Sequence, residues 1–386
     1  MDDGAPRLSP RLERACATIE NPGLPRGEPE QVSEFLPTLF VALVTALVVV
    51  SASTGWVDST LADGSVKNNS RWAHLAAAYE HIASQPGVDV IIIGSSRLYS
   101  GIDGSCLDAK TNHSGTSHWN LAVRGDFPYM RLPETDVLVR ANAQIVVIEA
   151  GPNTFSPGIG TRKNRLRWEV ESLSMEFDGD ESWWPLVRAE DEVYLATSII
   201  DRYRISQSFT PESSDELAHR FLLLGDSRAM EWRDGMMPDQ PGSPEWISAL
   251  KDPPRNDEVN LSSEEMAEYI EVLTASTFWQ ASSADHHNRR SLEHIIESLE
   301  SNGTKVILYA PAVHPDFLDA IPAGFWDEFN MSRESLTVDG RPYVDDTFES
   351  WNQSSFTDPV HFTESGRERL CKEMGRAIDS SLHKVV

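Results

Sequence analysis

Three residues that lie far apart in the chain are of the types that carry out nucleophilic catalysis together. Ser96 lies in the segment GSSR at residues 94–97, directly after an apolar run at 88–93, and Asp358 precedes His361 by three residues. A serine hydroxyl becomes an effective nucleophile when a neighbouring base removes its proton. A histidine is suited to be that base and then to protonate the leaving group, while a carboxylate orients the imidazole. These residues indicate acyl transfer at Ser96, with His361 as base and acid and Asp358 as its partner.

Two further residues are suited to stabilising the oxyanion of such a reaction. Gly125 ends the segment NLAVRG at residues 120–125, and Asn153 ends GPN at residues 151–153. The tetrahedral intermediate of acyl transfer needs hydrogen-bond donors that are already aimed at its oxygen. Taken singly, a glycine or an asparagine is more often only a turn residue. Their order along the chain, between the serine and the histidine, favours a functional site.

In this order, the segments GSSR, NLAVRG, GPN and DPVH (358–361) resemble the four sequence blocks of the SGNH, or GDSL-like, hydrolase superfamily. The resemblance implies a flavodoxin-like α/β fold, a serine–histidine–aspartate triad, and catalysis without metal or cofactor. It also implies that the oxyanion donors are the backbone N–H groups of Ser96 and Gly125 and the side-chain amide of Asn153. Each such donor contributes about 3 kcal/mol to transition-state stabilisation.

The chain departs from the family pattern beside two of these blocks. Ser95 stands where the family usually has aspartate, and Arg97 stands where it usually has leucine. Thr154 follows Asn153, where aspartate is common. The GSSR form resembles membrane-anchored members that handle acyl groups on cell-surface polymers, which makes Arg97 a candidate substrate-binding residue.

Other residues compete for the same roles. Ser227 lies in GDSR at residues 225–228, which is even closer to the family's first block, but the preceding sequence favours helix and no second or third block follows it. A loop or helix cap is the expected role of this serine. His314 follows the apolar segment 305–310 and is the second candidate for the base.

Metal and sugar sites are the remaining possibilities that the side chains suggest. Asp285, His286 and His287 could bind a metal, but no further ligand set accompanies them, so a solvated turn is favoured. The acidic cluster Asp178, Asp180 and Glu181 matches no full calcium loop. Trp183 and Trp184 could stack on a sugar ring, although buried core aromatics are the commoner case.

Alternating strands and helices are expected to position these residues. Apolar, β-branched runs predict strands, and apolar residues at helical spacing predict helices. The alternation indicates a doubly wound parallel sheet, whose functional sites lie at the carboxyl ends of the strands. Residues 156–290 interrupt it and are interpreted as a large, mostly helical insertion. The expected strands are 88–93, 118–123, 144–149, 305–310 and a weaker one at 343–348; the expected helices are 71–84, 132–143, 291–301 and 364–382.

An uncharged apolar segment precedes the α/β region. Residues 35–52 carry no charge and are long enough to cross a bilayer core, so a transmembrane helix is predicted over 35–53. More arginines precede this segment than follow it closely, which favours a cytoplasmic N-terminus and an extracytoplasmic domain at 54–386. Residues 1–34 read as a disordered cytoplasmic tail. A cleaved signal peptide and a buried core helix are the alternatives.

Charge, glycosylation sequons and cysteines bear on the environment of the domain. The net charge of -27 disfavours binding to nucleic acid and to anionic lipid headgroups. Two of the three cysteines, Cys106 and Cys371, follow the apolar segment and could form one disulfide or remain two buried thiols. Six N-x-S/T sequons also follow the apolar segment, which supports a glycosylated external domain. They begin at Asn68, Asn112, Asn260, Asn302, Asn330 and Asn352.

These features together predict a membrane-anchored serine esterase or acyltransferase. By the family resemblance, its expected substrate is an ester-linked acyl group of a cell-surface glycan. The alternative is a catalytically inactive domain of the same fold that binds a surface polymer or a membrane acyltransferase partner. The distance between the hydroxyl of Ser96 and the ring of His361 is the observation that separates the two hypotheses.

Overall fold

The computed structural model divides the chain into two compact units, residues 1–53 and 54–386. The residues that it describes are 40–42, 44–45, 74–85, 88–111, 115–155, 182–189, 191, 237–238, 240–255, 261–274, 286–337, 341–347, 349 and 351–382.

Only a short helical stretch of the first unit is described. Phe40, Val41 and Val44 belong to it and are exposed. The predicted tail at 1–34 and most of the predicted transmembrane helix at 35–53 lie outside the described residues. Among the residues that are described, no helix has the length and apolar character needed to span a bilayer.

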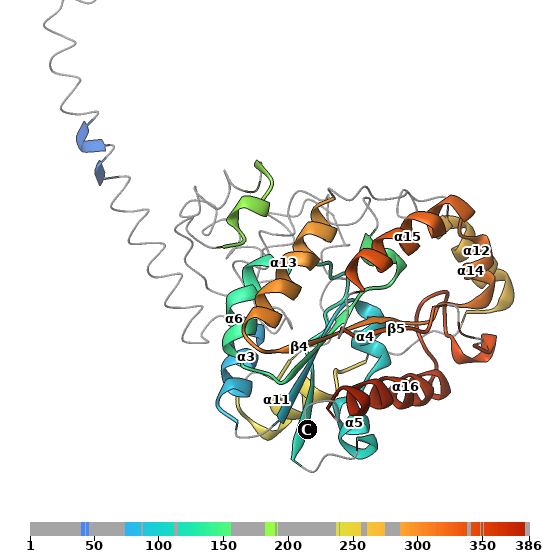
Figure 1. The fold of residues 1–386 in the computed structure, drawn as a ribbon, viewed down its shortest axis with the longest axis horizontal. Coiled ribbons are helices and arrows are strands. Elements are labelled where there is room, and N and C mark those ends of the chain that lie inside the picture. Colours follow the sequence, from blue (N-terminus) through green and yellow to red (C-terminus); the bar gives the residue numbers. More distant parts are fainter. Residues whose placement is uncertain are drawn as a thin grey trace, which may run out of the picture. The chain divides into compact units, whose positions relative to one another are not determined.

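A five-stranded sheet forms the centre of the second unit (Figure 1). All four neighbouring strand pairs are parallel, and the strand order is β2-β1-β3-β4-β5. This confirms the predicted α/β class with a parallel sheet. The central strands are almost wholly apolar because both faces of the sheet are covered. The strands are β1 (Val88–Ile93), β2 (Thr116–Asn120), β3 (Ile145–Glu149), β4 (Lys305–Ala310) and β5 (Tyr343–Asp345).

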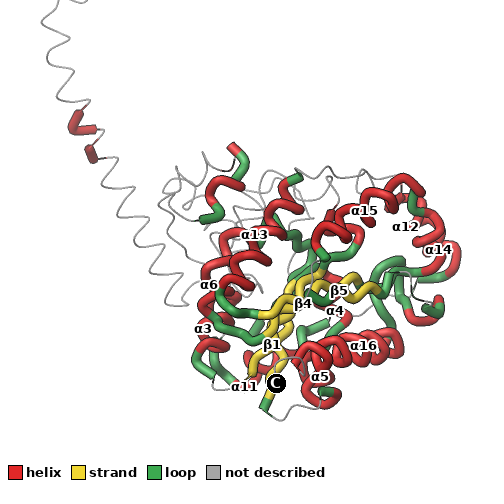
Figure 2. Tube along the Cα trace, in the orientation of Figure 1, coloured by secondary structure: helices red, strands yellow, loops and turns green. Residues whose placement is uncertain are grey.

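Successive residues of β1 enter two different cores. Val90 and Ile92 pack with α4, α5 and α16, whereas Ile91 and Ile93 pack with α3, α6 and α13. The helices accordingly lie on both sides of the sheet (Figures 1 and 2). Their bounds are α3 Leu75–Ala83, α4 Ser96–Gly101, α5 Gly104–Lys110, α6 Thr135–Arg140, α11 Pro244–Lys251, α12 Ser263–Thr274, α13 His287–Ser301, α14 Pro315–Ala320, α15 Ala323–Leu336 and α16 Glu364–Leu382.

The second strand begins and ends earlier than the predicted range of 118–123. Its last residue, Asn120, donates its side-chain amide to the carbonyl oxygens of Leu98 and Ile102. Leu121 still donates its backbone N–H to Ile92 of β1, and Val123 donates to Gly94 just after that strand, at 2.8 Å each, but both residues lie beyond β2. The strand was predicted to include residues 121–123 because they are apolar. The hydrogen bonds of the Asn120 side chain to Leu98 and Ile102 are tertiary contacts, which the apolar pattern does not reveal.

Other predicted elements also differ in length. The helix predicted at 291–301 begins four residues earlier, at His287. The helix expected at 132–143 is a 3-10 turn at Leu132–Glu134 followed by α6, which ends at Arg140, two residues before Asn142 adopts a left-handed φ of 53°. The fifth strand stops at Asp345, whose carboxylate accepts the backbone N–H of Thr347 and turns the chain. The helix predicted at 364–382 matches α16.

The described parts of the insertion at 156–290 are helices and loops. They include a 3-10 turn at Trp184–Leu186, α11 and α12. Trp183 is fully buried, and its ring lies 5.8 Å from that of Trp184. Burial favours the core role of Trp183 over sugar stacking.

A disulfide joins Cys106 of α5 to Cys371 of α16, with 6.4 Å between their Cα atoms. Of the two alternatives for these cysteines, the structure contains the bridge. It links two helices on the same face of the sheet that are 265 residues apart in sequence.

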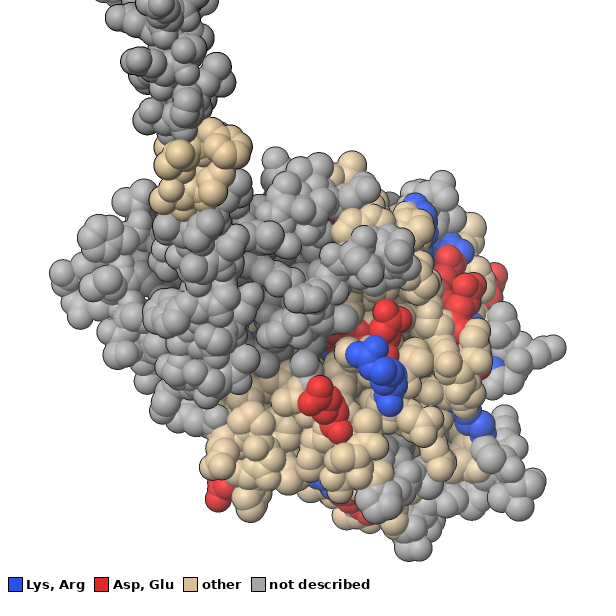
Figure 3. All heavy atoms as spheres, turned by 90° about the vertical axis from the view of Figure 1, so that its left-hand side faces the viewer, with Lys and Arg blue, Asp and Glu red and all other residues tan. Residues whose placement is uncertain are grey.

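The described surface of one face is drawn in Figure 3. Acidic and basic side chains are scattered there among uncharged residues, and the described part of this face carries no basic patch.

Candidate active site

The turn between β1 and α4 presents Ser96 as the first residue of a helix. Ser95 caps this helix, and its hydroxyl accepts the backbone N–H of Arg97. Gly94 is needed just before the turn, because a Cβ atom there would lie 2.6 Å from the Cβ of Glu149. The close approach of β3 therefore determines where the chain leaves the sheet and where Ser96 lies.

A tight loop before α16 holds the other two residues of the predicted triad. One carboxylate oxygen of Asp358 accepts the backbone N–H groups of Val360 at 2.8 Å and His361 at 2.9 Å. The loop closes on itself where Thr357 donates to the carbonyl of His361 at 3.0 Å. Side-chain bonding to nearby backbone is the usual way in which aspartate stabilises a turn.

The fold brings the three predicted residues into one hydrogen-bonded chain. Nε2 of His361 lies 2.9 Å from Oγ of Ser96, and Nδ1 of His361 lies 2.6 Å from Oδ2 of Asp358. An ionised carboxylate can only accept, so Nδ1 carries the proton and Nε2 is left to accept the serine hydroxyl. This geometry allows His361 to remove the proton of Ser96.

The environment of Asp358 favours its charged form. Burial alone would raise the pKa of this carboxyl, but the hydrogen bond and charge of His361 outweigh burial, with help from the backbone N–H groups of Val360 and His361. The net effect lowers the pKa of Asp358 below its ordinary value. Asp358 is therefore negatively charged when the imidazole of His361 takes the proton of Ser96, and it can stabilise the imidazolium that forms.

A small cavity adjoins the hydroxyl of Ser96. Its volume is about 120 Å³, and both Ser96 and Gly125 line it. Gly125 has φ of 68°, a left-handed conformation that glycine adopts without strain. The backbone N–H of Ser96 belongs to the first turn of α4, where N–H groups have no partner within the helix. Two of the three predicted oxyanion residues therefore border one cavity.

Asn153 is the third predicted oxyanion residue. It belongs to a 3-10 turn, Pro152–Phe155, that begins shortly after β3. Its side chain lies outside the described part of the structure. The backbone thus places Asn153 after the strand next to β1, at the carboxyl edge of the sheet where Ser96 also lies.

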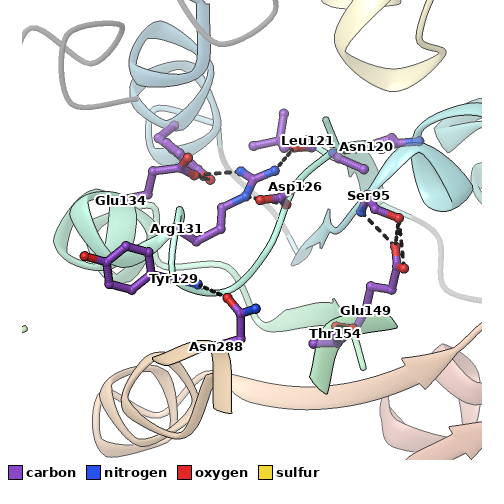
Figure 4. A network of polar contacts seen from close by, with 12 residues as sticks. Ser95, Asn120, Leu121, Asp126, Tyr129, Arg131, Glu134, Glu149, Thr154 and Asn288 are labelled. Carbon is purple, nitrogen blue, oxygen red and sulfur yellow. Dashed lines mark hydrogen bonds and ion pairs between the residues drawn. The ribbon is translucent and has the colours of Figure 1, made fainter. Parts of the chain in front are cut away.

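Glu149 supports the nucleophile turn and was missed by the sequence analysis. Its carboxylate accepts the backbone N–H of Ser95 at 2.7 Å and the hydroxyl of Ser95 at 2.9 Å (Figure 4). Nε and Nη2 of Arg97 donate to the same carboxylate at 3.0 and 2.6 Å. An acidic residue ending the apolar run QIVVIE was the only signal for this role.

Arg97 was predicted to bind substrate, and in the structure its guanidinium group pairs with Glu149. Its side chain is 1% exposed, and its ion pair with Glu149 is buried. Arg97 also lines the cavity beside Ser96. The departures from the family pattern at Ser95 and Arg97 are therefore coupled, since both side chains bind the same carboxylate.

Replacing Glu149 by alanine is expected to destabilise the fold by about 3–5 kcal/mol, because it leaves the guanidinium of Arg97 buried and uncompensated. Urea unfolding monitored by circular dichroism measures the loss. The exposed pair Glu373–Arg376 is the matched control, and Glu373→Ala is expected to cost less than about 1 kcal/mol. Equal costs for the two variants would show that the Glu149–Arg97 pair is not important for stability.

A second buried network lies on the other side of the cavity. Arg131 donates to Asp126 and to Glu134, both at 2.7 Å, and to the carbonyl of Leu121 at 2.9 Å (Figure 4). The hydroxyl of Tyr79 donates to Glu134 at 2.7 Å. Asp126 directly follows Gly125 and lines the cavity, so the network anchors the loop that carries one predicted oxyanion donor.

The carboxyl of Asp126 is held in an environment that disfavours its charge. Burial raises its pKa to about 7, against the charge of Arg131 and together with the charge of Glu134. In the unfolded chain the same group titrates near pH 3.9. The folded state therefore holds this proton more tightly than the unfolded state does.

Asp126→Asn is expected to remove a pH dependence of stability. The stabilisation from the protonated group is fully present below the unfolded pKa and is lost as the pH rises through about 7. The unfolding free energy of the wild type minus that of the variant should fall by up to about 1.4 kcal/mol per pH unit between about pH 5 and pH 7. Urea unfolding of both proteins at a series of pH values tests this, and a constant difference would contradict it.

The competing base, His314, has a different role. It caps α14, where its Nδ1 accepts the backbone N–H of Asp316 at 3.2 Å. Its own backbone N–H donates to the carbonyl of Pro359 at 2.9 Å, so it braces the loop that carries His361. Burial lowers the pKa of His314. The imidazole that contacts Ser96 is that of His361.

The other alternative sites fall largely outside the described residues. Ser227, the acidic cluster at 178–181 and Asp285 are among them. His286 caps α13, with its Nδ1 accepting the backbone N–H of Asn288. In the described part of the chain, no group of three or more His, Cys, Asp or Glu side chains is arranged to hold a metal ion.

Neither a scan against protein-family models nor a search of curated proteins finds a match for this chain.

Proposed function

We propose that the protein is a serine esterase or acyltransferase that uses Ser96, His361 and Asp358. The observation that carries the proposal is the 2.9 Å distance between Nε2 of His361 and Oγ of Ser96, with Asp358 bound to the opposite ring nitrogen. Such a chain of nucleophile, base and orienting carboxylate is the arrangement that activates a serine for attack on a carbonyl.

The proposed reaction proceeds in two steps. Oγ of Ser96 attacks the ester carbonyl while its proton passes to Nε2 of His361, and the oxyanion accepts hydrogen bonds from the N–H groups of Ser96 and Gly125 and from the Asn153 amide. The carbon–oxygen bond to the alcohol breaks, and His361 returns the proton to that alcohol. Water or a sugar hydroxyl then attacks the acyl-enzyme, with His361 as base, and Ser96 regains its proton.

The strand order supports the family resemblance. The order β2-β1-β3-β4-β5 is that of flavodoxin-like doubly wound sheets. The triad residues follow β1 and precede the last helix, as the SGNH resemblance implies. We therefore propose a flavodoxin-like SGNH-type fold for residues 54–386.

The substrate and location that we propose are an acylated cell-surface glycan and the outer side of a membrane. The Cys106–Cys371 bridge supports an oxidising compartment. The sequon residues Asn302 and Asn352 are exposed, as glycosylation requires. The apolar segment at 35–53 would supply the anchor, and a membrane acyltransferase partner would supply acyl groups in the transferase form of the reaction.

A fluorophosphonate probe tests the proposal on the full chain in detergent. The probe reacts with activated serines, so covalent labelling together with turnover of an acetyl ester is the expected result. The absence of both at several salt concentrations would instead support the non-catalytic binding module.

A further inference from the structure

The cavity beside Ser96 has apolar walls that belong to the interior of the fold. Ile93 and Ile148 line it from the carboxyl ends of β1 and β3. Leu292 and Ile295 line it from α13, where their spacing of three residues puts them on one face of the helix. All four side chains are at most 4% exposed. A guest that enters beside Ser96 therefore contacts side chains of the protein core.

These walls are held from behind by further core residues. The helix α13 packs against α6 and β4. Leu292 and Ile295 belong to the same hydrophobic core as Leu138 of α6 and Val306 of β4. Protein interiors are close-packed, and extra methylene groups forced into them displace side chains and backbone. The cavity is therefore not expected to widen readily for a larger guest.

The size of the cavity limits what it can hold. A cavity of roughly 150 Å³ holds a benzene molecule in another protein, and this one measures about 120 Å³. A guest smaller than benzene has about four carbon atoms, or fewer. This is the size of a short acyl chain.

The charged side chains that also line the cavity are already paired. The guanidinium of Arg97 lies 2.6 Å from the carboxylate of Glu149, and that of Arg131 lies 2.7 Å from the carboxylate of Asp126. An apolar guest leaves both pairs intact, whereas burying a further charge beside them would carry a desolvation cost. The walls thus suit an uncharged hydrocarbon chain.

The position of the cavity indicates which part of an ester it would hold. In the proposed reaction His361 returns a proton to the departing alcohol, so that alcohol must lie against the imidazole ring. The cavity is bordered by Ser96 and Gly125, and His361 is not among the described residues that line it. The cavity therefore suits the acyl part of the ester and not the alcohol.

We propose that this cavity binds the acyl chain and limits it to about four carbon atoms, with Leu292 and Ile295 as specificity-determining residues. The inference rests on the proposed function of Ser96. Acetyl, propanoyl and butanoyl groups fit within the cavity, and a longer chain would have to displace core side chains.

Two series of esters test the limit on the full chain. In 4-nitrophenyl esters of increasing acyl length, we expect kcat/KM for the hexanoyl and octanoyl esters to fall below that of the butanoyl ester by about tenfold or more. In alkyl acetates of the same chain lengths, no such fall is expected. A sharp limit in the alkyl acetates alone would make the cavity an alcohol site and overturn the proposal.

Variants of α13 test the two specificity-determining residues. Leu292→Ala and Ile295→Ala should each raise the ratio of kcat/KM for the hexanoyl ester to that for the acetyl ester by about fivefold or more. Leu299→Ala is the matched control, because Leu299 is as deeply buried on the same helix and is not among the described residues that line the cavity. Its ratio should stay at the wild-type value although its stability falls.

A milder variant guards against loss of the fold. Ile295→Val removes a single methylene unit and should raise the same ratio to a smaller extent. Fluorophosphonate labelling of each variant shows that the nucleophile turn is intact. If every labelled variant keeps the wild-type ratio, these residues do not set the limit and the proposal fails.

A binding measurement separates this inference from the proposed function. Ser96→Ala protein is titrated with the same 4-nitrophenyl esters, so that the chain-length limit is read from dissociation constants without turnover. If the wild type is labelled and hydrolyses octanoyl and acetyl esters equally well, the subsite proposal fails while the esterase proposal stands. If the wild type is neither labelled nor active, the esterase proposal fails. Binding that tightens steadily from acetyl to octanoyl would then remove the subsite as well, whereas binding that weakens beyond butanoyl would support it.

Discussion

Ser96→Ala is expected to lower kcat for an activated ester by at least about 10⁴-fold and to abolish fluorophosphonate labelling. Oγ of Ser96 is the atom that Nε2 of His361 contacts at 2.9 Å, and an alanine has nothing to attack the carbonyl. The hydroxyl lies at the surface of a cavity and not in a packed core, so the unfolding free energy should change by less than about 1 kcal/mol. Steady-state kinetics, labelling and urea unfolding of the full chain measure these effects.

Ser227→Ala is the matched control for this prediction. Ser227 lies in the other segment of the chain that resembles a nucleophile turn, GDSR. The Ser227 variant is expected to keep labelling and turnover. The opposite result, in which Ser227→Ala abolishes labelling and Ser96→Ala does not, would move the active site to residues 225–228.

Asp358→Asn should lower kcat by roughly 10³- to 10⁴-fold. The carboxylate accepts Nδ1–H of His361 at 2.6 Å and so leaves Nε2 free to take the proton of Ser96. An amide in its place can donate to Nδ1, which puts the ring proton on Nε2 and removes the base. It also loses the negative charge that stabilises the imidazolium. Kinetics across a range of pH measure the loss in kcat and show whether activity recovers at high pH.

Asp316→Asn provides the comparison for Asp358. Asp316 is a nearby carboxylate on α14 whose side chain is largely exposed and 3.9 Å from His314. Its replacement is expected to change kcat less than twofold, since no contact joins it to Ser96 or His361. If both asparagine variants lost activity to the same degree, a general effect of surface charge would explain the result better than a triad.

The strands were predictable because their physics is local. Residues 88–93 and 305–310 are apolar and β-branched, and a parallel strand covered on both faces needs such a run. The order of residue types also pointed to Ser96, Asp358 and His361. In the second strand the same local reasoning failed, because Asn120 makes hydrogen bonds to Leu98 and Ile102, which the strand pattern does not reveal.

The sequence by itself determined the α/β class and the residue types needed for acyl transfer. It also determined that these residues lie in turns and in a loop. Only the tertiary structure decided that Nε2 of His361 meets Oγ of Ser96 across 265 residues. It also decided that Glu149 joins Ser95 to Arg97, and that Asp126 and Arg97 border one cavity. The physical reason is that strand propensity and turn chemistry depend on neighbours in sequence. Buried ion pairs and triads depend on which strand ends lie side by side, which is determined by the packing of the whole sheet.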